Sequence, residues 1–287
     1  MSSYQIITDS GCDLPKAKLE ELSILSVPLT VNFKGETRED SVDGEISQMY
    51  NDLRAGESAS TSAINPDRWA RAIEPCLQKG QDVLVIAFSS GLSTTYQSAV
   101  IAASELSETY PDRKILVVDS LCASLGQGLL VWYACKKQQE GLSIEDLAAW
   151  IADVRPHLCH WFTVDDLMYL KRGGRINATT ALLGTMLNIK PVLHMDDEGH
   201  LISMSKARGR KAAIDALAAK AAQLCQPGKN EVMFICHGDC LEDAEYLAEK
   251  VKQTTEAKEV FIGYTGAVIG SHSGPGTLAL FFVGQHR

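Results

Sequence analysis

The run at residues 82–88, Asp-Val-Leu-Val-Ile-Ala-Phe, limits the possible folds most, because every residue after its aspartate is apolar. A strand with one solvent-exposed face alternates apolar and polar residues, so this run requires burial on both faces. Such strands lie in the middle of parallel sheets that carry helices on both sides. Helical patterns flank the run: Asn65-Pro66 is a typical helix start, and residues 93–106 follow as a second helix. We predict a central parallel strand here.

Strand-like and helix-like segments alternate throughout the first half of the chain. The other expected strands are residues 4–8, 27–33 and 114–119. The other expected helices are residues 15–22, residues 124–139 and a helix that starts at Ser143 with a capping-box pattern. Alternation of this kind predicts an α/β fold with a doubly wound parallel sheet.

The second half of the chain has a different pattern, which begins near Val154-Arg155-Pro156. A β-hairpin is expected from strands 188–194 and 201–206, on either side of the turn-forming residues 196–199. The remaining expected strands are 157–163, 231–237, 259–262 and 277–283, and the remaining helices are 165–171, 210–224 and 241–254. We predict two domains, with residues 1–156 as an N-terminal α/β domain and residues 157–287 as a C-terminal α+β domain.

The charge and the missing motifs exclude several classes of protein. The chain has 36 acidic and 27 basic residues, a net charge of −9, which argues against a nucleic-acid-binding scaffold. Neither a secretory signal nor an apolar run near the roughly 18 residues of a membrane span is present, so we expect a cytoplasmic protein without stable membrane insertion. The phosphate-loop, dinucleotide, nucleophile-elbow and zinc-helix motifs are also missing.

Small hydroxyl side chains follow the ends of the predicted strands. They occur in Thr8-Asp9-Ser10, in residues 89–95 and in Asp119-Ser120, and Ser60-Thr61-Ser62 precedes the helix at Asn65. Ligands of open α/β sheets bind at the carboxyl ends of the strands, where hydroxyls, amide hydrogens and helix starts favour anions. Capping and turn formation are the simpler explanation for any one of these loops. For residues 89–95, which follow the central strand, we favour an anion site.

Two further segments carry chemistry. His272 lies in the glycine-rich segment 266–277, which we expect to be a loop, and it is either a structural hydrogen-bonding residue or a ligand contact. Residues 169–175, Tyr-Leu-Lys-Arg-Gly-Gly-Arg, form a basic cluster on an acidic protein. These cations either complement the end of a helix or attract an anionic substrate or an acidic partner.

The eight cysteines do not show paired CxxC spacing. The segment Cys236-His237-Gly238-Asp239-Cys240 is the one metal-like cluster in the sequence, and its cysteines are separated by three residues. A zinc site commonly combines two closely spaced ligand pairs, whereas no second pair lies nearby in this sequence. We therefore expect reduced, mostly buried thiols and no metal.

Together these segments resemble the DegV family. The resemblance runs along nearly the whole chain and rests on Thr8-Asp9-Ser10, Thr61-Ser62, residues 89–93, residues 169–175 and residues 270–276. It implies a two-domain α/β protein that holds one long-chain fatty acid in an apolar tunnel near the domain junction. It also implies a fatty-acid-binding subunit of a bacterial fatty acid kinase, which presents the carboxylate to a separate ATP-binding kinase subunit for acyl-phosphate formation.

The resemblance also assigns site residues. The carboxylate contacts map onto Thr61 or Ser62, Ser93 and His272. It implies a carrier without catalytic residues or a cofactor of its own, since the ATP site would belong to the partner. For Arg172 and Arg175 we expect a contact with the kinase subunit or with phosphate, because a charge buried beside an acyl chain is costly unless it is paired.

Two alternatives stay open at this point. Arg175 could instead cap a local helix or pair with Asp165 or Asp166. The protein could also be a serine hydrolase that uses Ser93 as nucleophile and His272 as base. Asp9 or Asp119 would then supply the orienting acid that such a triad needs.

Overall fold

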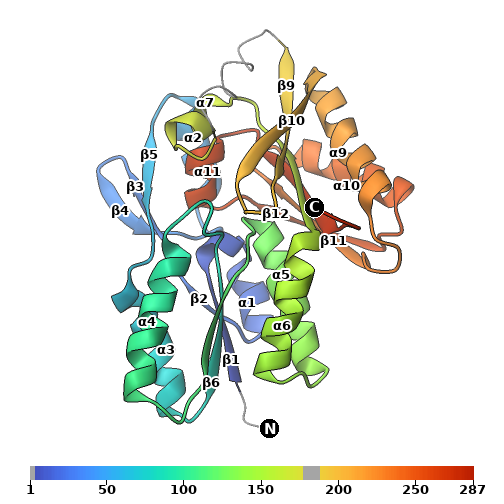
Figure 1. Ribbon diagram of the computed structural model, residues 1–287. Coiled ribbons are helices and arrows are strands. Elements are labelled where there is room, and N and C mark those ends of the chain that lie inside the picture. Colours follow the sequence, from blue (N-terminus) through green and yellow to red (C-terminus); the bar gives the residue numbers. More distant parts are fainter. Residues whose placement is uncertain (1–3, 177–187) are drawn as a thin grey trace.

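The chain folds as a mixed α/β structure (Figure 1). In the computed structural model, residues 4–176 and 188–287 are described, and their strands form three sheets. One sheet is parallel, one is mixed, and a small antiparallel sheet lies beside them. The predicted fold class is therefore confirmed. The division into two domains at residue 156 stays a prediction.

The parallel sheet confirms the prediction for residues 82–88. Its strand order is β2 (Leu25–Val27), β1 (Tyr4–Asp9), β6 (Asp82–Ala87) and β7 (Ile115–Asp119). Strand β6 pairs in parallel with β1 and β7, and all six of its residues are buried. Burial on both sides explains why this strand carries apolar residues at consecutive positions.

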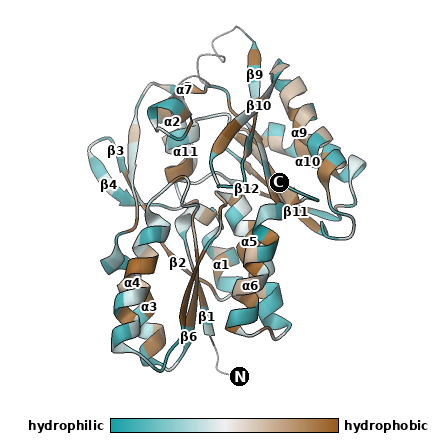
Figure 2. Cartoon of the chain, viewed as in Figure 1, coloured by the Kyte–Doolittle hydropathy of each residue, from teal (hydrophilic) through white to brown (hydrophobic). Residues whose placement is uncertain are grey.

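Helices cover both faces of the parallel sheet (Figures 1 and 2). Leu84 and Ile86 pack with α5 (Leu125–Gln139) and α6 (Ile144–Val154). Val83 and Val85 point the other way, towards α3 (Pro66–Gln78) and α4 (Thr95–Thr109). The short helices η1 (Ser10–Cys12) and α1 (Lys16–Glu21) follow β1. The sheet is thus doubly wound, as the alternation of strands and helices predicts.

The mixed sheet has the strand order β10-β9-β8-β13-β11-β12. These strands are β8 (Leu158–Thr163), β9 (Ile189–Met195), β10 (Leu201–Arg208), β11 (Val232–His237), β12 (Glu259–Tyr264) and β13 (Leu278–Val283). The predicted hairpin is confirmed as the antiparallel pair β9–β10. Helices α9 (Arg210–Leu224) and α10 (Leu241–Thr254) pack on one face of this sheet. Helix α5 packs on the other face and joins the two large sheets in one core.

The prediction of one strand at residues 27–33 is wrong. Strand β2 ends at Val27 in the parallel sheet, and β3 (Thr30–Phe33) belongs to the small antiparallel sheet with β4 (Glu36–Glu39) and β5 (Ala59–Ser62). Pro28 has no amide hydrogen for a sheet ladder, which explains why the chain changes sheet there. Strands β4 and β5 and helix α2 (Ile46–Arg54) were not predicted. Strand β4 is charged and exposed, and β5 consists of alanine, serine and threonine, so neither strand has a recognisable apolar pattern.

The prediction of a loop at residues 266–277 is also partly wrong, because this segment contains helix α11 (Ala267–Ser273). Gly266 and Gly274 lie at its two ends, and Gly274 has a φ of 81° that only glycine adopts readily. Helix α11 contacts β3 and β5 of the small sheet and α7 (Met168–Arg172). Helix α7 is shorter than predicted, and η2 (Arg155–His157) lies at the expected domain junction.

No helix within residues 4–176 and 188–287 combines the length and the apolar character that a membrane crossing requires.

Candidate functional site

A cavity of about 450 Å³ lies where the parallel sheet, the mixed sheet and α11 meet. Its lining includes all four predicted carboxylate contacts, which are Thr61, Ser62, Ser93 and His272. Arg175 lines the same cavity. The fold thus brings side chains from β5, the loop before α4 and α11 to one place, although they lie up to 211 positions apart in the sequence.

One face of the mixed sheet forms an apolar wall of this cavity. Ala279 and Phe281 of β13 lie opposite Phe162 and His160 of β8, and all four side chains line the cavity. His160 does not make this wall polar, because both of its ring nitrogens are occupied. Its Nε2 accepts a hydrogen bond from the Ala123 amide at 3.3 Å, and its Nδ1 lies 2.9 Å from the Leu158 carbonyl. Burial lowers the pKa of His160 well below its usual value, so this imidazole is neutral.

The polar end of the cavity is built around Thr61 and His272. The Oγ1 atom of Thr61 lies 2.7 Å from Nε2 of His272. Burial, and then the positive charge of Arg175, lower the pKa of His272 to about 4. His272 is therefore neutral at neutral pH when the cavity is empty. Ser62 follows Thr61 on β5 and is exposed, whereas Thr61 is half-buried.

Ser93 reaches the cavity from the loop before α4. Its Oγ lies 2.9 Å from Oγ1 of Thr95 and accepts a hydrogen bond from the Thr95 amide at 3.2 Å. Ser93 precedes the N-cap residue Thr94, and a contact from residue i to the amide of residue i+2 is typical of a serine in a turn. The hydroxyl nevertheless lines the cavity together with Leu92 and Thr94, so it serves the turn and the cavity at once.

A second cavity of about 270 Å³ shares Thr61, Arg175 and His272 with the first. It also contains Arg172, whose exposed guanidinium lies 4.6 Å from the centre of the Tyr169 ring. Three serines, Ser58, Ser60 and Ser271, complete much of its polar lining. The Thr61–His272 contact therefore stands between a mainly apolar cavity and a smaller basic one.

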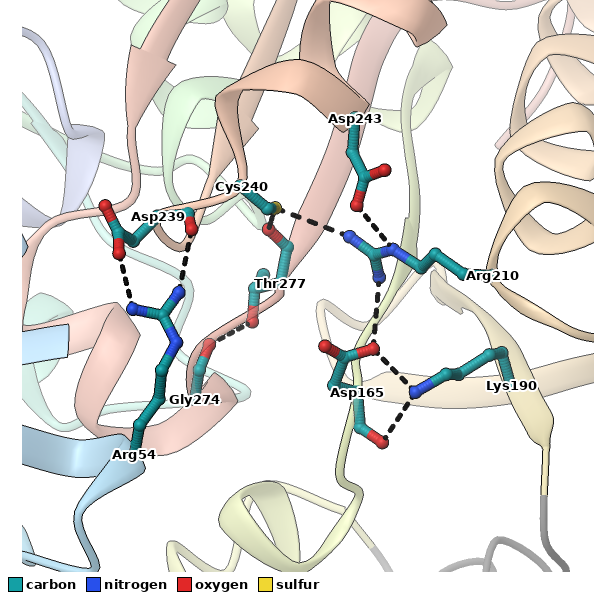
Figure 3. A network of polar contacts seen from close by, with 9 residues as sticks. All are labelled: Arg54, Asp165, Lys190, Arg210, Asp239, Cys240, Asp243, Gly274 and Thr277. Carbon is teal, nitrogen blue, oxygen red and sulfur yellow. Dashed lines mark hydrogen bonds and ion pairs between the residues drawn. The ribbon is translucent and has the colours of Figure 1, made fainter. Parts of the chain in front are cut away.

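Arg175 lies deeper than the sequence predicts. Its side chain is half-buried, and it donates hydrogen bonds to the Leu92 carbonyl at 3.2 Å and to the Gly173 carbonyl. The two aspartates considered as its partners have other contacts. The Asp165 carboxylate accepts a hydrogen bond from Lys190 Nζ at 2.6 Å (Figure 3), and the Asp166 carboxylate accepts one from the Met168 amide at 2.8 Å.

Gly173 contributes to the site, although the sequence alone assigned it no role of its own within the segment 169–175. A Cβ atom on Gly173 would lie 2.2 Å from Nδ1 of His272, which is closer than real contacts allow. The missing side chain leaves room for the imidazole between α7 and α11. The Gly173-Gly174 pair was the available signal, but its partner in space cannot be read from the sequence.

A polar network holds the turn after α11 (Figure 3). Thr277 lines the cavity, and its Oγ1 donates to the Gly274 carbonyl at 2.7 Å. The Cys240 thiol donates to the Thr277 carbonyl at 3.3 Å and receives a contact from Arg210 at 3.4 Å. Arg210 also donates to Asp243 at 2.8 Å. This network fixes the backbone that leads from His272 into β13.

The metal-like segment 236–240 serves the cavity and this network. The Ser124 hydroxyl donates to Cys236, whose side chain lines the cavity, while Cys240 contacts Thr277. His237 Nδ1 accepts the Cys240 amide at 3.3 Å. Among the residues that the structure describes, no group of three or more potential ligands is placed to hold a metal ion.

Size alone does not identify the ligand site. A third cavity of about 480 Å³ is lined by Trp132, Lys136, Trp150 and Lys229, among others, and by none of the predicted site residues. The first cavity differs because hydroxyls, an imidazole and a guanidinium converge at one end of a mainly apolar space. Such a combination is the usual form of a small-molecule site.

The structure does not assemble the alternative hydrolase triad. Ser93 contacts Thr95, and His272 contacts Thr61. Asp9 is fully buried and accepts the amides of Gly11 and Phe88, at 3.0 and 2.7 Å. Asp119 accepts the amides of Ser90 and Leu121, at 3.2 and 3.0 Å. Neither acid orients His272 as a triad requires.

Comparison with known proteins identifies the family. The model of the DegV family, described as uncharacterised proteins, matches residues 3–285. The chain belongs to the DegV family. A DegV domain-containing protein of Clostridium perfringens is 44% identical over all of this chain and 99% of its own length. The predicted resemblance is therefore confirmed.

Solved DegV structures share the fold. A fatty-acid-binding DegV protein from Thermus thermophilus has 33% identity and a TM-score of 0.86, and the match covers 99% of this chain and 100% of that one. The fatty acid kinase B3 protein of Streptococcus pneumoniae, loaded with linoleic acid, has 26% identity and a TM-score of 0.83, with 98% and 99% covered.

Proposed function

We propose that this DegV protein binds one long-chain fatty acid in the first cavity, with the carboxylate at the Thr61–His272 contact. The observation that carries this proposal is the gathering of Thr61, Ser93, His272 and Arg175 in the lining of one mainly apolar cavity. Fatty-acid binding by the Thermus thermophilus relative supports the choice of ligand.

The two ends of such a ligand play different roles. Each buried methylene group contributes about 0.8 kcal/mol to the binding free energy. The fourteen methylenes of palmitate therefore supply up to about 11 kcal/mol before the cost of ordering the chain. The polar residues of the cavity then determine the orientation in which the fatty acid binds. Thr61 and Ser93 offer hydroxyl hydrogens to the carboxylate, and the half-buried Arg175 supplies a positive charge nearby.

The second cavity supports a carrier that presents its ligand to a partner. A carboxylate at Thr61 and His272 would face the basic cavity that holds Arg172 and Arg175. This placement fits phosphate transfer to the carboxylate by a separate ATP-binding kinase subunit, as the pneumococcal relative's name suggests. We assign Arg172 and Arg175 to contact with that subunit or with phosphate. The carrier would have no catalytic residue or cofactor of its own and would act in the cytoplasm.

Mass spectrometry of the purified protein tests the binding function. The native mass should exceed the chain mass by one long-chain fatty acid, and organic extraction should release that acid. A protein that carries no lipid and takes up none from added palmitate would contradict the proposal.

Charge reversal tests the kinase step. Arg172→Glu should keep bound fatty acid but lower acyl-phosphate formation with the kinase subunit at least tenfold, because Arg172 is exposed and lines only the basic cavity. Lys171→Glu, which changes an adjacent cation outside both cavities, is the matched control. Normal acyl-phosphate formation by Arg172→Glu would exclude a role for this residue.

A further inference from the structure

Asp40 is a buried carboxylate that contacts the N-terminal end of α11. It follows β4, is 5% exposed, and accepts hydrogen bonds from Ser10 Oγ at 2.6 Å and from the Val268 amide at 2.9 Å. Burial raises the pKa of this carboxyl, and hydroxyl and amide hydrogens rather than a cation favour its charged form. A buried acid is costly unless its oxygens are satisfied, and here each carboxylate oxygen accepts a hydrogen bond.

One of these contacts leads to His272. Val268 is the second residue of α11, and His272 lies four residues further, on the same side of the helix. About 6 Å of helix separates the two positions. The start of α11 is also tightly packed, because a Cβ on Gly266 would lie 2.4 Å from the Asp13 carboxyl. The bond from Asp40 to Val268 therefore fixes the helix end from which His272 is placed.

The other contact leads to Thr61. Ser10 Oγ, which bonds to Asp40, also accepts the Leu29 amide at 2.9 Å, and the Asp40 amide donates to the Leu29 carbonyl at 2.9 Å. Leu29 directly precedes β3, and the antiparallel register of β3 and β5 places Val31 opposite Thr61. Asp40 thus holds the start of β3, the central strand of the small sheet, and the neighbouring strand β5 carries Thr61.

We propose that Asp40 is the positioning residue of the head-group site. It holds α11 against the small sheet so that His272 Nε2 stays 2.7 Å from Thr61 Oγ1, and it thereby sets the preference for a carboxylate over an uncharged head group. This inference rests on the proposed fatty-acid site. If Asp40 only stabilised the fold, its replacement would change the affinities of all ligands with the same acyl chain by the same factor.

Two ligands with the same chain separate these roles. Palmitate and 1-hexadecanol differ at the head group, so the ratio of their affinities measures the head-group site alone. We expect Asp40→Ala to lower the preference for palmitate about tenfold, the equivalent of one hydrogen bond to a charged group, and to leave hexadecanol binding unchanged. Asp82→Ala is the matched control, because Asp82 is also buried and accepts the Lys114 amide at 3.0 Å, but it starts β6 at the end remote from the cavity.

The outcomes distinguish this inference from the proposed function. A folded Asp40→Ala protein with the wild-type ratio would overturn the role of Asp40 alone. A wild-type protein without any preference for palmitate would overturn the carboxylate site itself, and the role of Asp40 with it. If Asp40→Ala does not fold, Ser10→Ala takes its place, because it keeps the Asp40 carboxylate and removes the hydrogen bond that Ser10 Oγ donates to it. We expect it to lower the ratio about threefold, and an unchanged ratio would overturn the inference.

Discussion

At the scale of single residues, the proposed carboxylate site centres on the contact between Thr61 and His272. Thr61→Val keeps the shape of the side chain and removes the hydroxyl that contacts His272. We expect about tenfold weaker palmitate binding, because a hydrogen bond to a charged group is lost, with a change in unfolding free energy of about 1 kcal/mol or less. Ser62→Ala is the matched control in competition binding. A larger loss in Ser62→Ala than in Thr61→Val would move the contact to Ser62.

The pKa of His272 gives a prediction about pH. Burial and Arg175 lower this pKa to about 4 in the empty protein, and a bound carboxylate should raise it. Binding then takes up a proton. The resulting gain in affinity is complete below pH 4 and is lost as the pH rises through the pKa of the complex. Palmitate affinity should therefore increase between pH 8 and pH 5.5.

The variant His272→Gln isolates this effect, because the free fatty acid titrates in the same way in both experiments and its contribution cancels in the ratio of affinities. We expect the ratio of wild-type to variant affinity to rise as the pH falls, measured by equilibrium binding at constant ionic strength. A ratio that stays constant from pH 8 to pH 5.5 would show that His272 does not gain a proton on binding.

Residue types and predicted loops indicated the segments around Thr61, Ser93 and His272, and the resemblance to the DegV family selected these residues, with Ser62 as the alternative to Thr61, as carboxylate contacts. Neither showed that Thr61 and His272 lie in contact. The loop after β6 was recognisable because its strand is apolar on both faces. The depth of Arg175 and the role of Asp40 were not recognisable. Both depend on contacts between segments far apart in the sequence, such as Arg175 with Leu92 and Asp40 with Val268.

At the scale of elements, the packing of α7 against α11 sets the place of His272. Gly173→Ala adds a Cβ 2.2 Å from His272 Nδ1, while its φ of −70° suits alanine. We expect a stability loss of about 1–3 kcal/mol from overpacking and at least tenfold weaker palmitate binding, measured by chemical unfolding and by equilibrium binding.

Gly174→Ala is the neighbouring control. Its φ of 69° is strained for alanine and costs about 1–2 kcal/mol. Among the residues that the structure describes, and apart from its two chain neighbours, none has a heavy atom within 4 Å of the added Cβ. Both variants should lose stability, and only Gly173→Ala should lose affinity. Equal losses of affinity would mean that α7 affects binding through general loosening and not through contact with His272.

The elements that could be predicted are those whose local sequence has a distinctive pattern of apolar or turn-forming residues. Strand β6, helix α9 and the β9–β10 hairpin have apolar faces or turn residues that define them locally. Helix α11 could not be predicted, because Gly270 and its two serines have low helix propensity and the helix depends on packing against β5 and α7. The exposed strand β4 has no apolar face to reveal it.

For the whole molecule, the proposed ligand site lies between the two large sheets, so a bound fatty acid should stabilise both. A ligand present at 100 times its dissociation constant adds about 2.7 kcal/mol to the unfolding free energy. Ala279→Phe would fill the middle of the apolar wall, beside Phe162 and Cys236. We expect it to abolish stabilisation by palmitate and to keep stabilisation by a shorter acid such as decanoate, in thermal unfolding scans. Undiminished stabilisation by palmitate would show that the chain does not pass Ala279.

The central claim is the place of the carboxylate, and a crystal structure of the protein with palmitate tests it most directly. We predict that a carboxylate oxygen lies within hydrogen-bonding distance of Thr61 Oγ1 or His272 Nε2, with the acyl chain against Phe162, Ala279 and Phe281. A carboxylate at the opposite end of the chain's density, beside Phe281, or a palmitate bound outside this cavity would contradict the account.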